Sequence, residues 1–506
     1  MSTSKRKNAG GDSNAKRKRK SNKEEDESGD SEFDDVSPDG NDEFKDSNKD
    51  DIDDLLGEDS GLRVPGRTHV GTLLICGATN WDIAGRRAPP KGSTKANVGP
   101  NLYSPHTLAP LEKIRIRYAV SGPNAAHTIL ITDEGKAMAF GRNDKGQLGT
   151  KDCTRRDVPT FIEGLQEHTF VDAAVGRNHS LLLTDRGVVY ACGDNKMGQC
   201  GTNSLNPTFP TAARVKHTGP PIVKVACGAD FSLILDCKGV LYSFGSPEYG
   251  QLGHGTTGEY IAQANKVSYN IEKVPKRICL YVEKGRDQRP VPVDFPEIID
   301  ISCGTNHSVA LDSRKRVFSW GFGGYGRLGH ADTKDEMVPR LLQFFSTTGR
   351  GVRSVHCGSS YSLAVNEHGM VYMFGLTKKT GEANMYPKPI RDLQGWKVRS
   401  VGCSYTSIVV AADDSVIAFG PSPTYGELGL GENRKSSTTP LELKKLDGIY
   451  IEHVSCGMCH TIMIARDDTD EEKERIATLP SYSPADGDDG PLRVEFIPSP
   501  REDILR

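Results

Sequence analysis

A repeated unit of roughly 50 residues constrains the fold of this chain more than any other feature. Each unit has two short apolar runs, then a glycine, then a glycine-rich loop, as in VGRNHSLLLTDRGVVYACGDNKMGQCG (175–201). Two half-units remain: LLICGATNWDIAG (73–85) carries the second half of the pattern, and VSCGMCHTIMIARDD (454–468) carries the first half. Joined, they make a seventh unit. The glycine after the second run recurs at Gly141, Gly193, Gly245, Gly321, Gly375 and Gly420.

Each unit is expected to form a small antiparallel sheet. The runs HSLLLT (179–184) and VVYACG (188–193) are apolar and are separated by the tight turn DRG, so they predict a hairpin. A further strand begins near a proline, as in VPTFIEGL (158–165). Short strands repeated in seven units predict an all-β fold, a seven-bladed β-propeller over residues 61–466. Because one blade cannot bury both of its faces, we expect the two half-units to pair and close the ring.

Charge separates the two ends of the chain from its middle. Residues 1–20 carry eight Lys or Arg and one Asp, whereas residues 21–60 carry three Lys and eighteen acidic residues. Residues 467–506 carry five basic and twelve acidic residues, which leaves the body with a net charge of +12. High charge and low hydrophobicity predict disordered tails at 1–60 and 467–506. A basic body suits nucleic acid, an acidic protein or an anionic membrane surface; a plain solvated surface is the alternative.

The sequence lacks the residue patterns of the common enzyme classes. GFGGYG (321–326) matches the G-x-G-x-x-G dinucleotide fingerprint, but GRNDKG and GSPEYG fill the same position in other units, so we interpret it as a repeat loop. No G-x-x-x-x-G-K-[ST], G-x-S-x-G or H-E-x-x-H pattern occurs. We therefore expect no catalytic residues, no cofactor and no small-molecule substrate. No run of 18 apolar residues occurs, so no membrane span is expected.

Histidine and cysteine recur at fixed positions of the unit, and CGMCH (456–460) raises the question of a haem or metal site. Phe231 and Tyr361 fill the histidine position in other units, and Val175 fills the cysteine position. We interpret both as packing positions and expect no metal ligands. Without a secretory signal, the twelve cysteines predict reduced thiols in a cytosolic or nuclear protein. The recurrent residues are His127, His179, His307, His460, Cys227, Cys303, Cys357 and Cys456.

The repeat resembles that of the regulator of chromosome condensation family, whose unit runs roughly Cys-Gly-x-x-His-Ser-x-x-Leu, aromatic-Gly and Gly-Gln-Leu-Gly. The resemblance covers about residues 68–466, and long stretches such as FSWGFGGYGRLGHADTKDEMVPRL (318–341) are similar to one member in particular. It implies binding of small GTPases of the Rac, Arf or Ral type by an adaptor. Alternatively, it implies guanine-nucleotide exchange, which the founding member performs on the Ran GTPase. It also implies association with the centromere and spindle midzone in mitosis.

The N-terminal tail has the layout of a bipartite nuclear import signal, and a basic arm can also bind nucleic-acid phosphates. Its basic residues are Lys5, Arg6, Lys7, Lys16, Arg17, Lys18, Arg19 and Lys20. Serines followed by proline, or by an acid three residues later, predict phosphorylation in mitosis. They are Ser31, Ser37, Ser47, Ser483 and Ser499. Added phosphate would deepen the negative charge of the tails.

Two parts of the propeller are candidates for partner binding. An insertion at about 256–296 lengthens one unit, and its part 273–293 is expected to form a basic hairpin with a turn near Gly285. Its basic residues are Lys273, Lys276, Arg277, Lys284, Arg286 and Arg289. The second candidate is one rim of the ring, where polar residues that vary between units precede the recurrent histidine. They are Arg177, Asn178, Asp230, Asn306 and Ser360.

These observations favour a recognition platform over an enzyme. The first hypothesis is a chromosome-associated adaptor that binds and regulates small GTPases, and the second is a guanine-nucleotide exchange factor. A chromatin-binding module without a GTPase role is the third. We expect a monomer whose partners are a small GTPase, chromatin or nucleosomes, and microtubules. The expected locations are the nucleus, including the nucleolus, chromosomes and the spindle midzone in mitosis, and partly the cytoplasm.

Overall fold

The computed structural model describes residues 63–86, 99–262, 266–285, 287, 289–377, 381–421 and 425–484. The predictions for the basic N-terminal arm and for Ser31, Ser37, Ser47, Arg286 and Ser499 lie outside these residues. Within the described part of the chain, no helix is long and apolar enough to cross a membrane.

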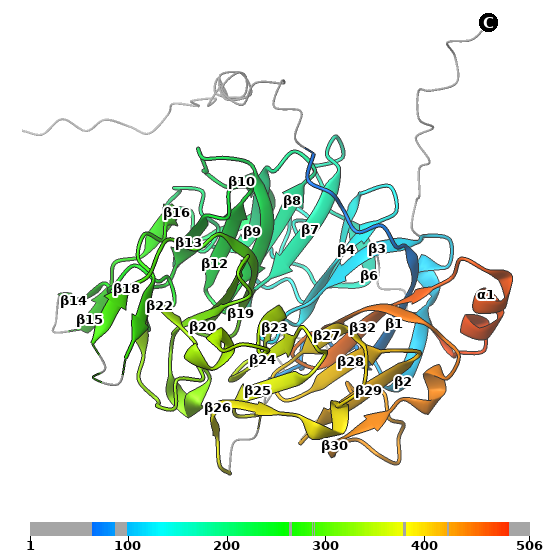
Figure 1. Ribbon diagram of the computed structural model, residues 1–506. Helices are drawn as coiled ribbons and strands as arrows, with labels where there is room; N and C mark the ends of the chain where they lie inside the picture. The colour runs from blue at the N-terminus through cyan, green and yellow to red at the C-terminus, as the bar shows by residue number, and fades with distance from the viewer. Residues whose placement is uncertain are drawn as a thin grey trace, which may run out of the picture. The chain divides into compact units, whose positions relative to one another are not determined.

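Antiparallel sheets arranged around a ring form the body of the described chain, so the predicted all-β, propeller-type fold is confirmed (Figure 1). In each sheet the first strand lies toward the ring centre. These first strands are β3 (Ile116–Val120), β7 (Phe170–Val175), β11 (Ile222–Cys227), β19 (Ile298–Cys303), β23 (Val352–Cys357), β27 (Val398–Cys403) and β31 (Ile451–Cys456). The second strands are β4 (His127–Thr132), β8 (His179–Thr184), β12 (Phe231–Asp236), β20 (His307–Asp312), β24 (Tyr361–Asn366), β28 (Ile408–Ala412) and β32 (His460–Arg466).

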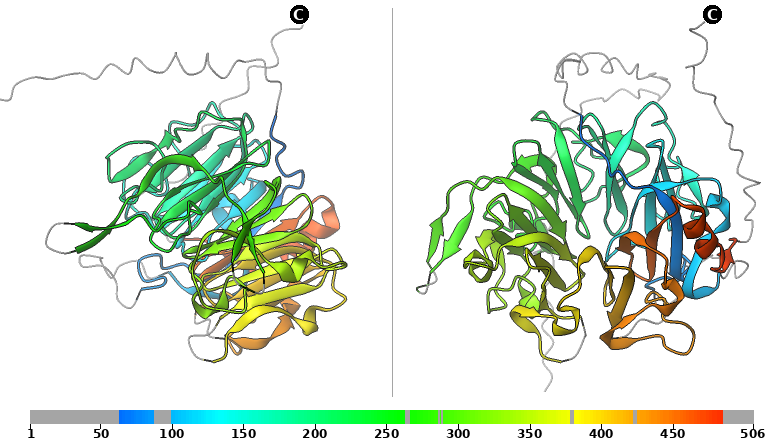
Figure 2. Two further views of the ribbon diagram at one scale, coloured as in Figure 1. Left: turned by 60° about the vertical axis from the view of Figure 1, so that its left-hand side comes forward. Right: turned by 45° about the vertical axis from the view of Figure 1, so that its right-hand side comes forward.

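The two outer strands complete each sheet, and the views of Figure 2 show the sheets stacked face against face. The third strands are β5 (Ala137–Gly141), β9 (Val189–Asp194), β13 (Leu241–Gly245), β21 (Val317–Gly321), β25 (Val371–Gly375), β29 (Ser415–Gly420) and β1 (Gly71–Ala78). The fourth strands are β6 (Arg156–Phe161), β10 (Thr208–Arg214), β16 (Glu272–Arg277), β22 (Glu336–Leu341), β26 (Asn384–Pro389), β30 (Ser437–Glu442) and β2 (Asn101–Leu108). Short 3-10 turns lie at Ala109–Leu111, Gly324–Gly326, Gln343–Ser346, Arg391–Leu393 and Lys444–Leu446.

The second strands explain why the sheets stack. In β8 (HSLLLT) every residue is buried, so both faces of the strand are covered, and its three leucines follow one another rather than alternating with polar residues. Leu181 and Leu183 of β8 pack in one cluster with Ile222 and Val225 of the next sheet. Apolar contact between neighbouring sheets, rather than within one sheet, therefore forms the core.

A chain of hydrogen bonds also joins neighbouring sheets at the recurrent histidine. His127 Nε2 lies 2.9 Å from Ser180 Oγ of the next sheet, and this hydroxyl donates to the backbone oxygen of Gln147 at 2.8 Å. Because the hydroxyl proton is already engaged, Nε2–H of the imidazole must be the donor. The arrangement recurs in His179–Ser232–Gln199 and His307–Ser362–Arg327. The recurrent histidine therefore links neighbouring sheets through a buried hydrogen bond.

These imidazoles are held neutral. Burial lowers the pKa of His127 and His179 to about 3 and that of His460 to about 4. Their Nδ1 atoms have no hydrogen-bond partner among the described residues, so a proton added there would stay unpaired.

The two ends of the propeller pair directly with each other. β1 and β32 are antiparallel from the pair Gly71 and Arg466 to the pair Gly77 and His460. CGMCH lies at this seam, because Cys456 ends β31 and His460 begins β32. The expected pairing of the half-units is confirmed.

The C-terminal segment corrects one prediction, because residues 467–484 are ordered rather than part of a disordered tail. The helix α1 (Asp470–Ala477) begins with a capping box, in which Thr469 and Glu472 satisfy each other's backbone N–H groups. Ile476 is buried in the core cluster of the seam, and β33 (Ser481–Tyr482) pairs with β2. The high charge of this segment suggested disorder, but it is compatible with a helix. The acidic residues lie near the helix N-terminus, where negative charge is favourable, and only one face of the helix needs to be apolar. Ser483, just beyond β33, is exposed.

The insertion is organised differently from the prediction of a single hairpin over 273–293. β16, which includes Lys273, Lys276 and Arg277, is the fourth strand of its sheet and pairs with β13. The hairpin consists of β17 (Val282–Lys284) and β18 (Pro290–Pro292), and β17 also lies parallel to β22. A second hairpin, β14 (Glu259–Ala262) with β15 (Lys266–Tyr269), precedes β16. Lys273, Lys276 and Arg277 were wrongly assigned to the insertion, because the sequence around them fits a separate hairpin as well as it fits the fourth strand of the sheet.

The seam should be sensitive to one glycine. Gly77 has φ +108°, and a Cβ there would meet Cys459 O at 2.5 Å and His460 Cα at 2.6 Å. Gly164 also has positive φ but has nothing within 4 Å of a Cβ. We expect Gly77→Ala to lower the free energy of unfolding by about 3 kcal/mol or more in urea titrations, and Gly164→Ala by only about 1 kcal/mol. Equal costs would show that backbone conformation alone matters at the seam.

The buried, neutral histidines that link the sheets predict a loss of folding stability in mild acid. Because the pKa of His179 is lower in the folded than in the unfolded chain, the unfolded chain takes up the proton as the pH falls below about 6.5. Stability is then lost by about 1.4 kcal/mol per pH unit for each such histidine. His179→Phe should cost about 1 kcal/mol at neutral pH, for the lost bond to Ser232, but should flatten this decline.

Urea titrations at about pH 7.5 and about pH 5 would check this prediction. His69→Phe is the matched control, because His69 is exposed and takes part in no hydrogen bond between sheets among those described. An unaltered pH dependence in His179→Phe would contradict the assignment of a neutral buried imidazole.

Candidate partner-binding surface

The residues predicted for the rim lie in equivalent loops, each between the first and second strand of a sheet. Arg177 and Asn178 join β7 to β8, and Asp230 joins β11 to β12. Asn306 joins β19 to β20, and Ser360 joins β23 to β24. Successive first strands run in the same sense around the ring, so these loops share one rim, and their role in binding stays a prediction.

Hydrogen bonds tie the rim loops to one another. The backbone N–H of Arg177 donates to Ala229 O at 3.1 Å, that of Ala229 to Thr305 O at 3.0 Å, and that of Thr305 to Ser359 O at 3.3 Å. Thr305 Oγ1 also donates to Asn124 Oδ1 at 2.8 Å, which links loops 181 residues apart in the sequence. The rim is thus ordered before any partner binds, which lowers the entropy cost of association.

One ion pair marks the exposed part of this rim. Arg177 Nη1 lies 2.9 Å from Asp230 Oδ2, and the Arg177 side chain remains 47% exposed. Burial raises the pKa of Asp230, and the Arg177 charge opposes this rise. Such a half-exposed pair contributes little to stability, so it is free to exchange partners on binding.

Acidic neighbours pair with Lys284 and Lys276, two of the basic residues that were predicted for the insertion. Lys284 Nζ lies 2.7 Å from both carboxylate oxygens of buried Glu336, and Lys276 pairs with Glu272. Arg277 lies over the ring of Phe295, 5.0 Å from its centroid. The predicted basic hairpin is therefore a weaker electrostatic feature than its composition suggests.

The hairpin of β14 and β15 is the more prominent feature, and sequence analysis missed it. Its strands pair only with each other, and it extends away from the ring (Figure 2). Ile261, Val267 and Tyr260 are 75%, 55% and 44% exposed. Large apolar side chains on a projecting hairpin are typical of a contact surface. The alternating runs EYIA and KVSY were the signal that could have revealed it.

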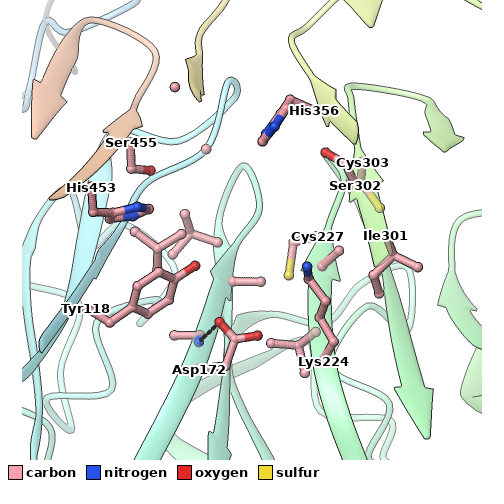
Figure 3. Close-up of a pocket in the computed structure, with 18 of the residues that line it drawn as sticks. Tyr118, Asp172, Lys224, Cys227, Ile301, Ser302, Cys303, His356, His453 and Ser455 are labelled. Carbon is pink, nitrogen blue, oxygen red and sulfur yellow. Dashed lines mark hydrogen bonds between the residues drawn. The ribbon is translucent and has the colours of Figure 1, made fainter. Parts of the chain in front are cut away.

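A cavity of about 450 Å³ lies at the ring centre, lined by the first strands of the sheets. Figure 3 shows Tyr118, Asp172, Lys224 and His356 among the side chains that line it. Sequence analysis missed these residues because Asp172 and Lys224 are single charged residues within otherwise apolar strands, and Tyr118 and His356 lie in strands of mixed composition. Their signal is a polar residue in the middle of the first strand, as in VDAAV and VKVAC.

The charged groups of this cavity are largely engaged with one another. Lys224 pairs with Asp300; burial works to lower the pKa of Lys224, but Asp300 outweighs it and the net shift is upward. Arg67, which precedes β1, lies 4.4 Å from the Tyr118 ring centroid and 3.0 Å from His453 Nδ1. The polar groups of the cavity therefore bind mainly to one another, as in a buried polar core. Among the described residues, no group of three His, Cys, Asp or Glu could hold a metal ion.

Comparison with known proteins fits the repeat and the ring. Residues 134–183, 186–235, 238–311 and 316–365 match the regulator of chromosome condensation (RCC1) repeat. The chain is 52% identical to Protein RCC2 homolog of Danio rerio over 416 residues, which are 82% of this chain and 84% of the relative. It is 51% identical to Protein RCC2 of Homo sapiens over 425 residues, 84% of this chain and 81% of the relative.

The chain belongs to the regulator of chromosome condensation repeat family. Solved structures with this family's repeat or a similar ring share its fold. Yeast RCC1 (Prp20), in a structure with Kap60, matches with a TM-score of 0.63 and 20% identity, over 82% of this chain and 93% of that chain. Human WBSCR16 matches with a TM-score of 0.62 and 23% identity, over 79% of this chain and 100% of that chain.

Proposed function

We propose that this member of the family is a chromatin-associated regulator of small GTPases that acts as a binding adaptor. The observation that carries the proposal is its identity of about one half with vertebrate Protein RCC2 over most of both chains. A study of yeast Prp20p, which has the same fold, addresses its binding to Gsp1p and to histones. The basic body of this chain has the charge to approach nucleic acid.

We further infer the finer points of this role. The GTPase is of the Rac, Arf or Ral type, and the protein works in mitosis at the centromere, spindle midzone and microtubules, with a nuclear and partly cytoplasmic location between divisions. It acts as a monomer. We count the ring as seven-bladed, with the last blade built from β31, β32, β1 and β2.

The rim and the β14–β15 hairpin support an adaptor. The rim loops are bonded to one another, so they present a fixed polar surface. The hairpin adds exposed apolar side chains beside it, because the loop that contains it joins a third to a fourth strand and so opens on the same rim. A polar rim around a small apolar centre is the usual composition of a specific protein interface.

Guanine-nucleotide exchange is the second candidate, and the same hairpin favours it. An exchange factor must bind the nucleotide-free GTPase far better than the loaded one, which requires contact near the nucleotide site. A narrow, projecting two-stranded hairpin has a shape that can reach into such a site. Adaptor and exchange factor differ in one observable, the rate of nucleotide release.

Nucleotide release from a panel of Rac-, Arf-, Ral- and Ran-type GTPases would separate the two candidates. With the full chain, we expect binding to at least one GTPase, measured by calorimetry, without faster release of a fluorescent GDP analogue. Accelerated release would favour exchange over the adaptor. Absence of binding to every GTPase in the panel would overturn both proposals.

The hairpin variant Ile261→Asp sharpens this test. Burial of an isoleucine contributes about 2 kcal/mol, so we expect GTPase binding to weaken roughly tenfold or more. Leu205→Asp is the matched control, because Leu205 is 84% exposed in the β9–β10 loop of the same rim and should have little effect. Equal weakening by both variants would show that added negative charge on the rim, rather than the hairpin, lowers affinity.

A further inference from the structure

The loop between β21 and β22 departs from its counterparts because of one residue. In four equivalent loops a Gln or Glu side chain accepts a hydrogen bond from the backbone N–H two residues earlier. These pairs are Lys145 with Gln147, Met197 with Gln199, Tyr249 with Gln251 and Tyr425 with Glu427, at 2.7–2.9 Å. Arg327 occupies this position between β21 and β22. Because a guanidinium can only donate, it cannot make this bond.

The arginine reverses the local hydrogen bonding and turns Tyr325 outward. Arg327 Nε donates to Gly324 O at 2.8 Å, and Nη1 donates to Ser359 O at 3.3 Å. Tyr325, two residues before it, has φ +62° and ψ +15°, whereas none of the counterparts has positive φ. A bulky residue in this conformation is strained, and such strain gathers at functional sites. Tyr325 is left 52% exposed.

Tyr325 belongs to a row of aromatic side chains that we call the aromatic ridge, made of Tyr249, Phe322, Tyr325 and Tyr405. The Tyr249 and Phe322 ring centroids are 5.0 Å apart. Arg327 joins Phe322 to Tyr325, because its guanidinium carbon lies 4.7 Å from one ring centroid and 5.7 Å from the other. Burial lowers the pKa of Arg327 to about 10. Arg327 donates to Ser359 O, and the backbone N–H of Ser359 donates to Ser404 O at 3.3 Å, which places the loop of Tyr405 beside the ridge.

Two carboxylates border the ridge. Burial raises the pKa of Tyr249, and the charges of Glu248 and Asp335 raise it further, so both acids act on the ridge. Asp335 accepts a hydrogen bond from Gly323 N at 2.8 Å, and neither carboxylate forms an ion pair within the described part of the chain. Aromatic faces beside unpaired carboxylates are the chemistry that recognises an ammonium or guanidinium group.

We propose that the aromatic ridge binds an extended, arginine- or lysine-bearing peptide segment of a partner protein. A basic side chain would lie against the exposed faces of Tyr325 and Tyr405, with its charge directed to Asp335 and Glu248. The local charge selects this partner, because the body as a whole is basic and repels polycations elsewhere. The site uses none of the residues named for the rim and the β14–β15 hairpin, but its loops open on the same rim.

Fluorescence anisotropy with the full chain and a labelled peptide of alternating arginine and glycine would test the ridge. Tyr325→Ala and Asp335→Asn should each weaken binding about three- to tenfold. Arg327→Gln should do the same by restoring the loop of the other repeats, which withdraws Tyr325. Tyr386→Ala is the matched control, since Tyr386 is 51% exposed on the outer strand β26, and it should bind like the unmodified chain.

Three outcomes would overturn the proposal. The first is that the unmodified chain fails to bind the peptide, and the second is that the ridge variants bind it as well as the control does. The third is that a glutamate–glycine peptide binds better, which would point to an acidic partner recognised by Arg327. Replacing the eight basic residues of 1–20 by glutamine in the full chain distinguishes the source. If this variant bound the peptide several-fold more tightly, the occupant would be the chain's own arm rather than a partner.

Discussion

The hydrogen bond from a buried histidine to a hydroxyl of the neighbouring sheet is the interaction on which the ring depends. It works only while the imidazole is neutral and both sheets are in register, so it couples the position of each sheet to the next. At the seam, His460 Nε2 lies 2.8 Å from Thr128 Oγ1, which extends the pattern across the two chain ends. In one unit Tyr361 replaces the histidine, and its hydroxyl reaches Ser407 O at 3.0 Å.

Stability and recognition are divided between different parts of the repeat. The second strands are buried along nearly all their length, and a histidine begins four of them, whereas Phe231, Tyr361 and Ile408 begin the others. Polar atoms buried there need a hydrogen-bond partner, which limits change in this part of the repeat. The rim loops are free to differ, and they differ where a partner is proposed to bind. The β14–β15 hairpin and the strained loop at Tyr325 both interrupt a regular repeat, and such local departures are expected at functional positions.

Sequence reasoning succeeded where the repeat itself carried the signal. The alternation of strands and turns, the closure by half-units and the packing role of CGMCH follow from comparing one unit with another. It failed for α1, where the bulk charge of residues 467–484 outweighed a capping box that was present in the sequence. It also divided the insertion wrongly, because Lys273 and Arg277 read equally well as a hairpin or as the fourth strand of a sheet. Only the partner strand β13 distinguishes the two.

The sequence by itself determined that this chain folds into a ring of repeated sheets, because period, glycine position and apolar runs recur in every unit. It also determined that CGMCH belongs to a packing position, since other units place apolar residues there. The tertiary structure alone decided which polar residues meet. Tyr249, Phe322, Tyr325 and Tyr405 are spread over 157 sequence positions, and their loops become neighbours only because the sheets stack around a closed ring.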